Sequence, residues 1–170
     1  MSYSADPALN EAWVAYAWRR WLLGYYRGGA IVDAACGLGV KGSVLLRCGA
    51  RRVIGLDLDL GCLHEARERG LCVVRVNLAE KIALRAGVAD LVLLIHAIEH
   101  FDDGSGLLRR LSDILRPGGA IVVVTPDWAK NKTGFYDDPT HRRPYTKIAL
   151  EAVLRESSPF LVEIAERLLT

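Results

Sequence analysis

The sequence lacks a large charge excess, a long apolar run and any closely spaced pair of cysteines. Lysine and arginine number 22 against 20 aspartates and glutamates in 170 residues, which argues against a scaffold devoted to nucleic-acid binding. No apolar run approaches the roughly 20 residues that a membrane-spanning helix needs, and the N-terminus has no signal-peptide pattern. We therefore expect no membrane insertion and a cytoplasmic location.

The four cysteines, at positions 36, 48, 62 and 72, form no Cys-x-x-Cys pair and have no histidine at metal-site spacing. Cys36 belongs to a glycine-rich stretch, and the other three fit helix or strand patterns as small apolar residues. The cysteines therefore predict neither a disulfide framework nor a metal site, and they suit a reducing compartment.

What the sequence does contain is typical of one globular domain spanning residues 1–170. Apolar residues make up 51% and charged residues 25% of the chain, and no repeat or linker interrupts it. We divide it into an N-terminal helix (1–28), a ligand-binding core (29–125), a long loop (126–146) and a C-terminal helix with a last strand (147–170).

Apolar runs and turn residues alternate along the core. The pattern predicts strands near 30–35, 52–57, 71–76, 90–96 and 119–125, and helices near 40–48, 60–69, 105–115 and 145–156. Asp6-Pro7 predicts a further helix that continues to about Tyr26, with one of its two aromatic stripes on the sheet, and residues 80–87 form a short helix or a turn. The alternation indicates an α/β fold with a doubly wound, mostly parallel sheet and ligands at the carboxyl ends of its strands.

The first predicted strand runs into a glycine-rich turn, Gly37-x-Gly39-x-x-Gly42, and Asp57 follows one strand later. Glycines at such a turn let the backbone approach a nucleotide, and a carboxylate at the next strand tip suits ribose hydroxyls. NAD is one candidate ligand. However, Asp33 lies beside the turn, where it would repel a pyrophosphate and would suit the ammonium group of an amino-acid tail.

The stretch Asp33-x-Ala35-Cys36-Gly37-x-Gly39 resembles the first motif of class I S-adenosylmethionine-dependent methyltransferases. Four further segments resemble the same family in order, ending at Leu115-Arg116-Pro117-Gly118-Gly119 and the strand that follows. The resemblance implies a Rossmann-like methyltransferase fold and S-adenosyl-L-methionine as cofactor. The cofactor-binding residues that it implies are Asp33, Ala35, Gly37, Gly39, Asp57 for the ribose, Leu58 and Leu78 around the adenine, Asn77 for its amino group, and His96.

Methyl transfer to oxygen needs a base, commonly histidine or a carboxylate. His96 and His100 follow the fourth predicted strand, and His141 lies in the long loop, so His96 and His141 are candidate catalytic residues. The Asp-Pro-Thr-His-x-Arg-Pro stretch of that loop resembles methyltransferases linked to surface-polysaccharide synthesis. This predicts substrate contacts from His100, Asp138, His141 and Arg142, although a purely structural loop stays open.

We therefore expect a methyltransferase acting on a small or sugar-type hydroxyl, with RNA and protein acceptors still open. The alternatives are a non-enzymatic S-adenosylmethionine-binding subunit or sensor, and an NAD-dependent dehydrogenase. The family's sheet usually ends in two further strands, whereas only 160–165 remains as a strand candidate here, and a helix competes for it. An incomplete sheet edge would favour a homodimer.

Overall fold

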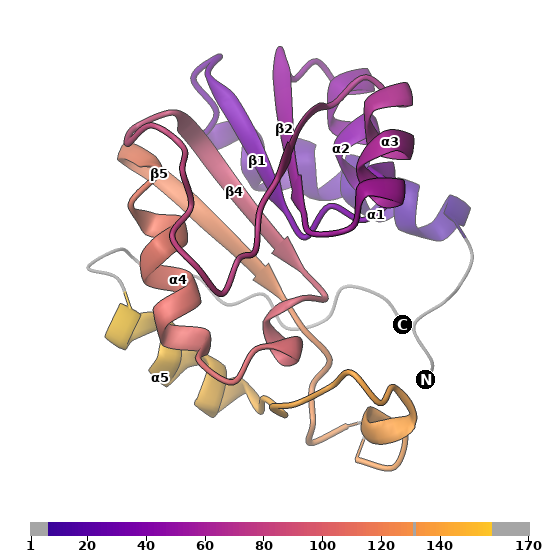
Figure 1. The fold of residues 1–170 in the computed structure, drawn as a ribbon, viewed down its shortest axis with the longest axis vertical. Helices are drawn as coiled ribbons and strands as arrows, with labels where there is room; N and C mark the ends of the chain where they lie inside the picture. Colours follow the sequence, from indigo (N-terminus) through magenta and orange to yellow (C-terminus); the bar gives the residue numbers. More distant parts are fainter. Residues whose placement is uncertain (1–6, 131, 158–170) are drawn as a thin grey trace.

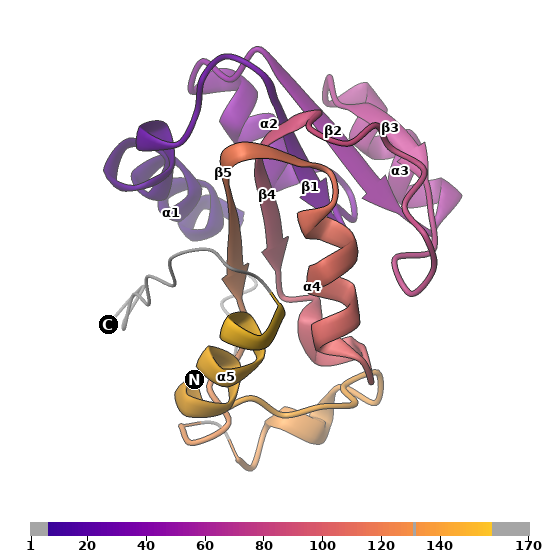
Figure 2. The ribbon, with the colours of Figure 1, turned by 90° about the vertical axis from the view of Figure 1, so that its left-hand side faces the viewer.

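The structure, a computed structural model, describes residues 7–130 and 132–157 and contains a parallel five-stranded sheet. Its order is β3-β2-β1-β4-β5, which Figure 2 shows across the width of the view. Every ladder is parallel, so the predicted doubly wound α/β fold is confirmed. The strands are β1 (Ala30–Ala34), β2 (Arg52–Asp57), β3 (Cys72–Arg75), β4 (Ala89–Ile95) and β5 (Leu115–Val124).

Helices cover both faces of the sheet (Figure 1). One face carries α1 (Pro7–Arg20), α2 (Val40–Arg47) and α3 (Leu60–Glu68), and the other carries α4 (Gly104–Ser112) and α5 (Lys147–Ser157). Short 3-10 turns are η1 (Leu22–Gly24), η2 (Ile98–His100) and η3 (Phe135–Asp137). None of the helices in the described ranges is long and apolar enough to cross a bilayer.

The central strands are buried on both faces, as their continuous apolar sequences predict. All five residues of β1 and all seven of β4 are buried. Their side chains divide between two clusters, one beneath α1, α2 and α3 and one beneath α4 and α5. Of the two aromatic stripes on the first helix, the one with Trp18 and Leu22 packs into the former cluster, so part of α1 is core as expected.

Three element boundaries differ from the sequence-based expectation. The first helix ends at Arg20 and not near Tyr26, because Trp21 leaves helical geometry with φ −131°. The fourth helix ends at Ser112 and not at 115, and β5 begins at Leu115 and not at 119. The reason is a ladder pairing of Leu115 with Ala89, followed by a register shift that accommodates the glycines. Residues 80–87, expected as a short helix or a turn, are mostly irregular, with a turn at 86–87.

Side-chain hydrogen bonds cap the start of two helices. The Asp59 side chain accepts from the Cys62 N–H at 2.7 Å at the start of α3. The Thr146 hydroxyl accepts from the Ala149 N–H at 3.2 Å at the start of α5. The candidate strand at 160–165, and with it the expected incomplete sheet edge, lies outside the described residues.

A buried ion pair closes the amino end of the sheet. Asp90, whose side chain is 3% exposed, pairs with Arg116. Its Oδ2 atom accepts the N–H groups of Arg27 at 2.6 Å and Gly29 at 2.8 Å. Burial would raise the pKa of Asp90, but these hydrogen bonds and the guanidinium outweigh it and hold the pKa below its ordinary value. The cluster fastens the segment before β1 to β4 and β5, far from the carboxyl ends.

Candidate functional site

A cleft of about 730 Å³ opens at the carboxyl ends of the strands. Ligand pockets of roughly this size bury most of a cofactor-sized molecule. It lies where the chain order reverses, since β1 is flanked by β2 on one side and β4 on the other. Its lining residues are Ala35, Asp57, Leu58, Val76, Asn77, Leu78, Ala79, His96, Ala97, His100, Phe101, Asp102, Asp103, Arg110 and Arg142.

Asp57 stands at the tip of β2 with both carboxylate oxygens oriented by backbone N–H groups. Its Oδ2 atom accepts from Gly37 at 2.8 Å, and its Oδ1 atom accepts from Asp59 at 3.0 Å. Each oxygen keeps lone-pair capacity for a further donor. Asp57 is therefore a preorganised acceptor for two neighbouring hydroxyl groups.

The cleft wall contains backbone strain. Ala35, at φ 57°, and His96, at φ 52°, are the two non-glycine residues with positive φ in the part of the chain that the structure describes. Both line the cleft. Such conformations cost of the order of 1–3 kcal/mol and are concentrated at functional sites. The coincidence supports a functional role for this cleft over the other surfaces of the protein.

The glycines of the first motif divide into two roles. At Gly37, with φ +51°, an added Cβ would meet nothing within 4 Å. At Gly39 an added Cβ would lie 2.7 Å from the backbone of Ala66 in α3. Packing against α3 therefore already requires a small residue at Gly39, whether or not a ligand approaches it. Neither glycine is among the cleft-lining residues.

Asp33 is buried beneath the glycine-rich turn, at 2% exposure, and does not line the cleft. Its Oδ2 atom has no hydrogen-bond partner among the described residues. Burial raises the pKa of Asp33 to about 6, and the neighbouring charge of Lys41 opposes that rise. A buried carboxylate with a bare oxygen favours a cationic or hydrogen-donating neighbour.

Apolar and amide side chains line the cleft between the ends of β2 and β3. Leu58 is 54% exposed and Leu78 is buried, and both line the cleft together with Asn77. The Asn77 Oδ1 atom accepts from the Ala79 N–H at 3.1 Å, and its amide nitrogen donates to Glu80 at 2.9 Å. These bonds fix the amide orientation and leave Oδ1 one further lone pair for a ligand donor.

The end of β4 brings His96 next to a buried carboxylate. The His96 Nδ1 atom lies 3.7 Å from Glu99 Oε1, and the Thr125 hydroxyl donates to Glu99 Oε2 at 2.8 Å. Burial would raise the pKa of Glu99, but hydrogen bonding from His96, from its own backbone and from Thr125 lowers the pKa below its ordinary value. Glu99 is therefore a negative charge at neutral pH, buried directly behind the cleft.

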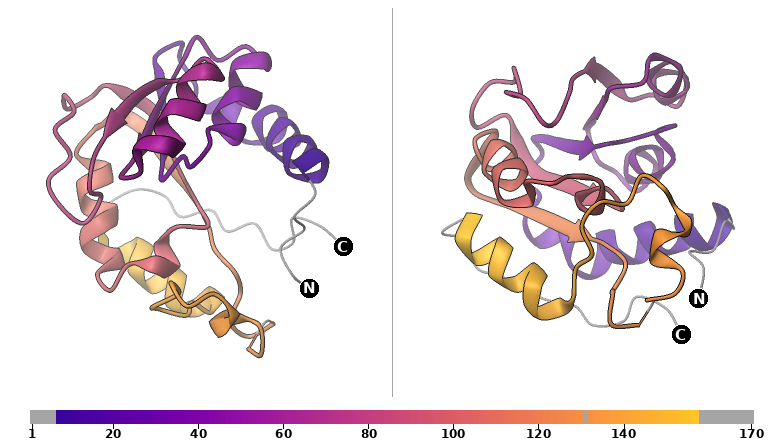
Figure 3. Two further views of the ribbon diagram at one scale, coloured as in Figure 1. Left: turned by 45° about the vertical axis from the view of Figure 1, so that its right-hand side comes forward. Right: turned by 60° about the horizontal axis from the view of Figure 1, so that its bottom comes forward.

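The long loop returns to the same place, as Figure 3 shows from below the carboxyl ends. The backbone N–H groups of Arg142 and Arg143 donate to the Glu99 carbonyl at 2.9 and 3.0 Å. The Arg142 guanidinium donates to Asp102 at 2.9 Å and lines the cleft. The His141 ring lies 4.8 Å from the His100 ring, centroid to centroid. Arg142 thus lines the cleft, and His141 lies beside His100 without lining it.

Asp138 lies behind this wall and not in the cleft. It accepts from the Thr140 N–H at 2.8 Å and from the Thr140 hydroxyl at 2.5 Å. These hydrogen bonds lower the pKa of Asp138. Asp138 and His141 do not line the cleft, whereas His100 and Arg142 do. Within the structure, Asp138 is a support for the loop.

Sequence reasoning gave no role to Glu99, although it lies at the centre of this wall. In the sequence, the only indication is that Glu99 stands beside His100 after an apolar strand. The residues that Glu99 faces come from a loop some 40 residues later, so the sequence alone does not reveal them. Asp102, Asp103 and Arg110 also line the cleft without having been predicted. Their sequence pattern is that of an ordinary solvated helix start, and Asp103 does cap α4 through the Gly106 N–H at 2.8 Å.

Comparison with known proteins agrees with this geometry. A family model described as "Methyltransferase domain" matches residues 32–123, more than half of the chain. A probable S-adenosylmethionine-dependent methyltransferase of Mycolicibacterium smegmatis is 34% identical over 140 residues, covering 80% of this chain and 53% of that protein. A ubiquinone biosynthesis O-methyltransferase of Escherichia coli is 31% identical over 104 residues, covering 58% and 43%.

The chain thus spans about half the length of these curated relatives. Among solved structures, an S-adenosylmethionine-dependent methyltransferase from Mesorhizobium loti superposes with a TM-score of 0.70 at 24% identity, covering 92% of this chain and 84% of that one. That likeness shows the fold, and the family follows from the sequence matches. The chain belongs to the class I S-adenosylmethionine-dependent methyltransferases.

Proposed function

We propose that this chain transfers a methyl group from S-adenosylmethionine to a hydroxyl oxygen of a small or sugar-type acceptor. The observation that carries the proposal is the composition of one cleft. Its β2 and β3 side supplies a ribose-type acceptor and a ring-binding surface, and its β4 side supplies histidines. A dehydrogenase would need a pyrophosphate site, whereas here the buried Asp33 carboxylate lies under the glycine-rich turn.

The residues present fit the cofactor. Asp57 accepts the two ribose hydroxyls, since each of its oxygens is already oriented by a backbone N–H. Leu58 and Leu78 flank the adenine, and the Asn77 Oδ1 atom accepts from its amino group. The open space over Gly37 and the bare oxygen of Asp33 mark the amino-acid end. When bound, S-adenosylmethionine supplies an electrophilic methyl group on a sulfonium.

The chain's own contribution is alignment, exclusion of water and proton removal. His96 lines the cleft at the end of β4, and Glu99 behind it stabilises a positive charge on the imidazole. His96 is therefore placed to take the acceptor proton as the oxygen is methylated. His141 is a positioning residue in this account, because it contacts His100 and does not line the cleft.

The mouth of the cleft favours a polar acceptor. Asp102, Asp103, Arg110 and Arg142 line it, so several hydrogen-bond donors and acceptors surround the entrance. Sugar hydroxyls match such a rim better than an apolar ring does. The Escherichia coli relative is an O-methyltransferase, and the long loop resembles that of polysaccharide-associated enzymes. Both support an oxygen acceptor.

Two measurements test the proposal. Calorimetry with S-adenosylhomocysteine and NAD in parallel should give binding to the first and none to the second. Transfer of a labelled methyl group should then be followed over sugars, small phenols, RNA and protein. Label on a sugar or small hydroxyl compound supports the proposal. Label confined to RNA or protein would show that the acceptor is a macromolecule and not a small or sugar-type molecule. Binding of S-adenosylhomocysteine without methyl transfer to any acceptor would favour a sensor or a non-enzymatic subunit.

A further inference from the structure

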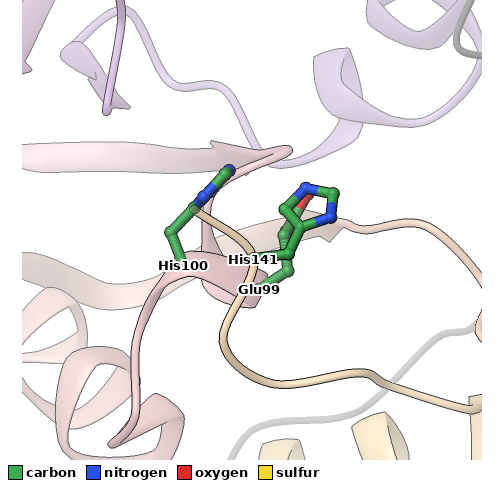
Figure 4. A group of neighbouring side chains, drawn as sticks. All are labelled: Glu99, His100 and His141. Atoms are coloured by element: carbon green, nitrogen blue, oxygen red, sulfur yellow. The ribbon is translucent and has the colours of Figure 1, made fainter. Parts of the chain in front are cut away.

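Three side chains from two distant segments converge beside the cleft. Glu99 and His100 come from η2, and His141 comes from the long loop, as Figure 4 shows. One ligand-type atom of each lies within 4.8 Å of the others. Two imidazoles and one carboxylate in such a group are a known ligand set for divalent transition metals. Proximity alone is weak evidence for a metal site. The hydrogen bonds of each side chain show whether its ligand atom is available to a metal.

Glu99 supplies a bare oxygen. The residue is 0% exposed, and its Oε2 atom accepts from the Thr125 hydroxyl. Its Oε1 atom makes no hydrogen bond within the described residues, and its ionic neighbour is His96, whose Nδ1 atom lies 3.7 Å away. Leaving a buried carboxylate oxygen unsatisfied costs free energy, and native proteins rarely do so without reason. A cation at Oε1 would remove that cost.

His100 is held in the tautomer that a metal needs. Its Nδ1 atom lies 3.2 Å from the Thr140 carbonyl oxygen and 2.9 Å from the Thr140 hydroxyl. The carbonyl only accepts, and the hydroxyl already donates to Asp138 at 2.5 Å, so Nδ1 carries the proton. The Nε2 atom of neutral His100 therefore presents a lone pair.

His141 is held in the same way. Its Nδ1 atom lies 2.5 Å from the carbonyl oxygen of Phe135 and donates to it. The Phe135 ring packs against the imidazole at 4.4 Å between centroids, which fixes the ring plane. The other ring nitrogen, Nε2, lies 3.8 Å from Asp138 Oδ2 and is the atom that would bind a metal. A histidine that donates one ring N–H to a backbone carbonyl is the arrangement found at metal sites.

We propose that Glu99, His100 and His141 bind one divalent transition-metal ion at the wall of the cleft, through Glu99 Oε1 and the Nε2 atoms of the two histidines. Bonds of about 2.0–2.2 Å require the three atoms to draw closer together by small side-chain rotations. His100 lines the cleft and is only partly buried, so it has room to move. The sequence predicted no metal because the ligands lie about 40 residues apart and not in a short motif.

A metal here would take an oxygen of the acceptor as a further ligand. Because a bound cation lowers the pKa of a coordinated hydroxyl, it would ease loss of the acceptor proton. This role rests on the proposed methyl transfer, whereas metal binding itself does not and can be measured without any acceptor.

Cobalt(II) is the probe, since its visible bands report coordination and a near-ultraviolet thiolate band would reveal binding to cysteine instead. Protein stripped with a chelator should bind one cobalt ion with visible bands and no thiolate band. His141→Ala should weaken binding at least about 100-fold, and Thr140→Val, which removes a hydroxyl that orients His100, about tenfold. His64→Ala, on the exposed side of α3, is the matched histidine control and should bind as the wild type does.

Glu99→Gln keeps the shape of the side chain and guards against a folding artefact, with circular dichroism as the check. Unchanged cobalt affinity in folded His141→Ala or Glu99→Gln would overturn the proposal. So would a thiolate band, or the absence of any band at millimolar cobalt. Asp57→Ala separates the two proposals, because it should lose S-adenosylhomocysteine binding and keep the cobalt spectrum.

Discussion

The backbone N–H of Gly37 donates to Asp57 Oδ2 at 2.8 Å, so the glycine-rich turn after β1 and the tip of β2 are held as one unit. The same carboxylate also accepts from Asp59 at 3.0 Å. Two residues that are 20 positions apart in sequence therefore share the task of shaping the cleft. A substitution at Asp57 should therefore remove ligand contacts and, to a smaller degree, loosen the glycine-rich turn.

Asp57→Ala should weaken S-adenosylhomocysteine binding by about tenfold or more, because each charge-assisted hydrogen bond is worth about 1.5–3 kcal/mol. Calorimetry measures this directly. Asp59→Ala is the control, since it removes only the α3 cap and should cost about 1 kcal/mol of stability with affinity unchanged. Equal affinities in wild type and Asp57→Ala would refute the ribose assignment.

The two glycines of the turn should respond differently to alanine. Gly39→Ala should lower the free energy of unfolding by more than about 2 kcal/mol, because the new Cβ would collide with Ala66 at a position with φ +76°. Gly37→Ala should cost about 1 kcal/mol from its positive φ alone and should weaken cofactor binding. Urea unfolding without ligand gives both values, and the reverse order of stabilities would contradict the packing seen at Gly39.

Asp33 should make the ligand-free protein less stable as the pH rises. Its folded pKa of about 6 exceeds the ordinary value of 3.8, so its neutral form is favoured in the fold. Its contribution is fully present below pH 3.8 and is lost as the pH rises through about 6. Asp33→Asn should therefore stabilise the ligand-free protein at pH 8 by up to about 3 kcal/mol and by little at pH 4.

The same Asp33→Asn variant should bind S-adenosylhomocysteine more weakly, because the cationic amino group loses its counter-charge. Unfolding curves at the two pH values, with and without ligand, measure both effects together. A variant that gains no stability at pH 8 would show that burial does not govern this carboxyl.

Asp90 should have the opposite pH dependence from Asp33, because it stabilises the fold at neutral pH and not in acid. Its pKa is held below the ordinary value, so its contribution to stability is present above that ordinary value and is lost as the pH falls through the folded pKa. Asp90→Asn leaves Arg116 without its counter-charge and should cost about 3 kcal/mol at pH 7. The gap between variant and wild type should close in strong acid, as followed by circular dichroism. A gap that stays constant with pH would assign the loss to packing and not to charge.

Much of the fold was predictable from the sequence because β1 and β4 are continuous apolar runs bounded by turn residues. The start of β5 was not, since Leu115-Arg116-Pro117-Gly118-Gly119 reads as a turn. Pairing with Ala89 and burial of Leu115 override that local preference.

For the site, strand-end residues such as Asp57, Asn77 and His96 were predictable because parallel strands bring their carboxyl ends together. The roles of Gly39 and Glu99 were not predictable. The first depends on how closely α3 packs, and the second depends on the return of a loop some 40 residues away. Both are tertiary facts that no local pattern encodes.

Transfer of a tritiated methyl group from S-adenosylmethionine tests the central claim most directly. The account predicts label on a hydroxyl oxygen of a sugar or small molecule, with His64→Ala as active as the wild type. His96→Ala should reduce turnover by about 10²–10⁴-fold while S-adenosylhomocysteine affinity stays nearly unchanged. Tight S-adenosylhomocysteine binding without label on any acceptor, or full turnover in His96→Ala, would contradict it.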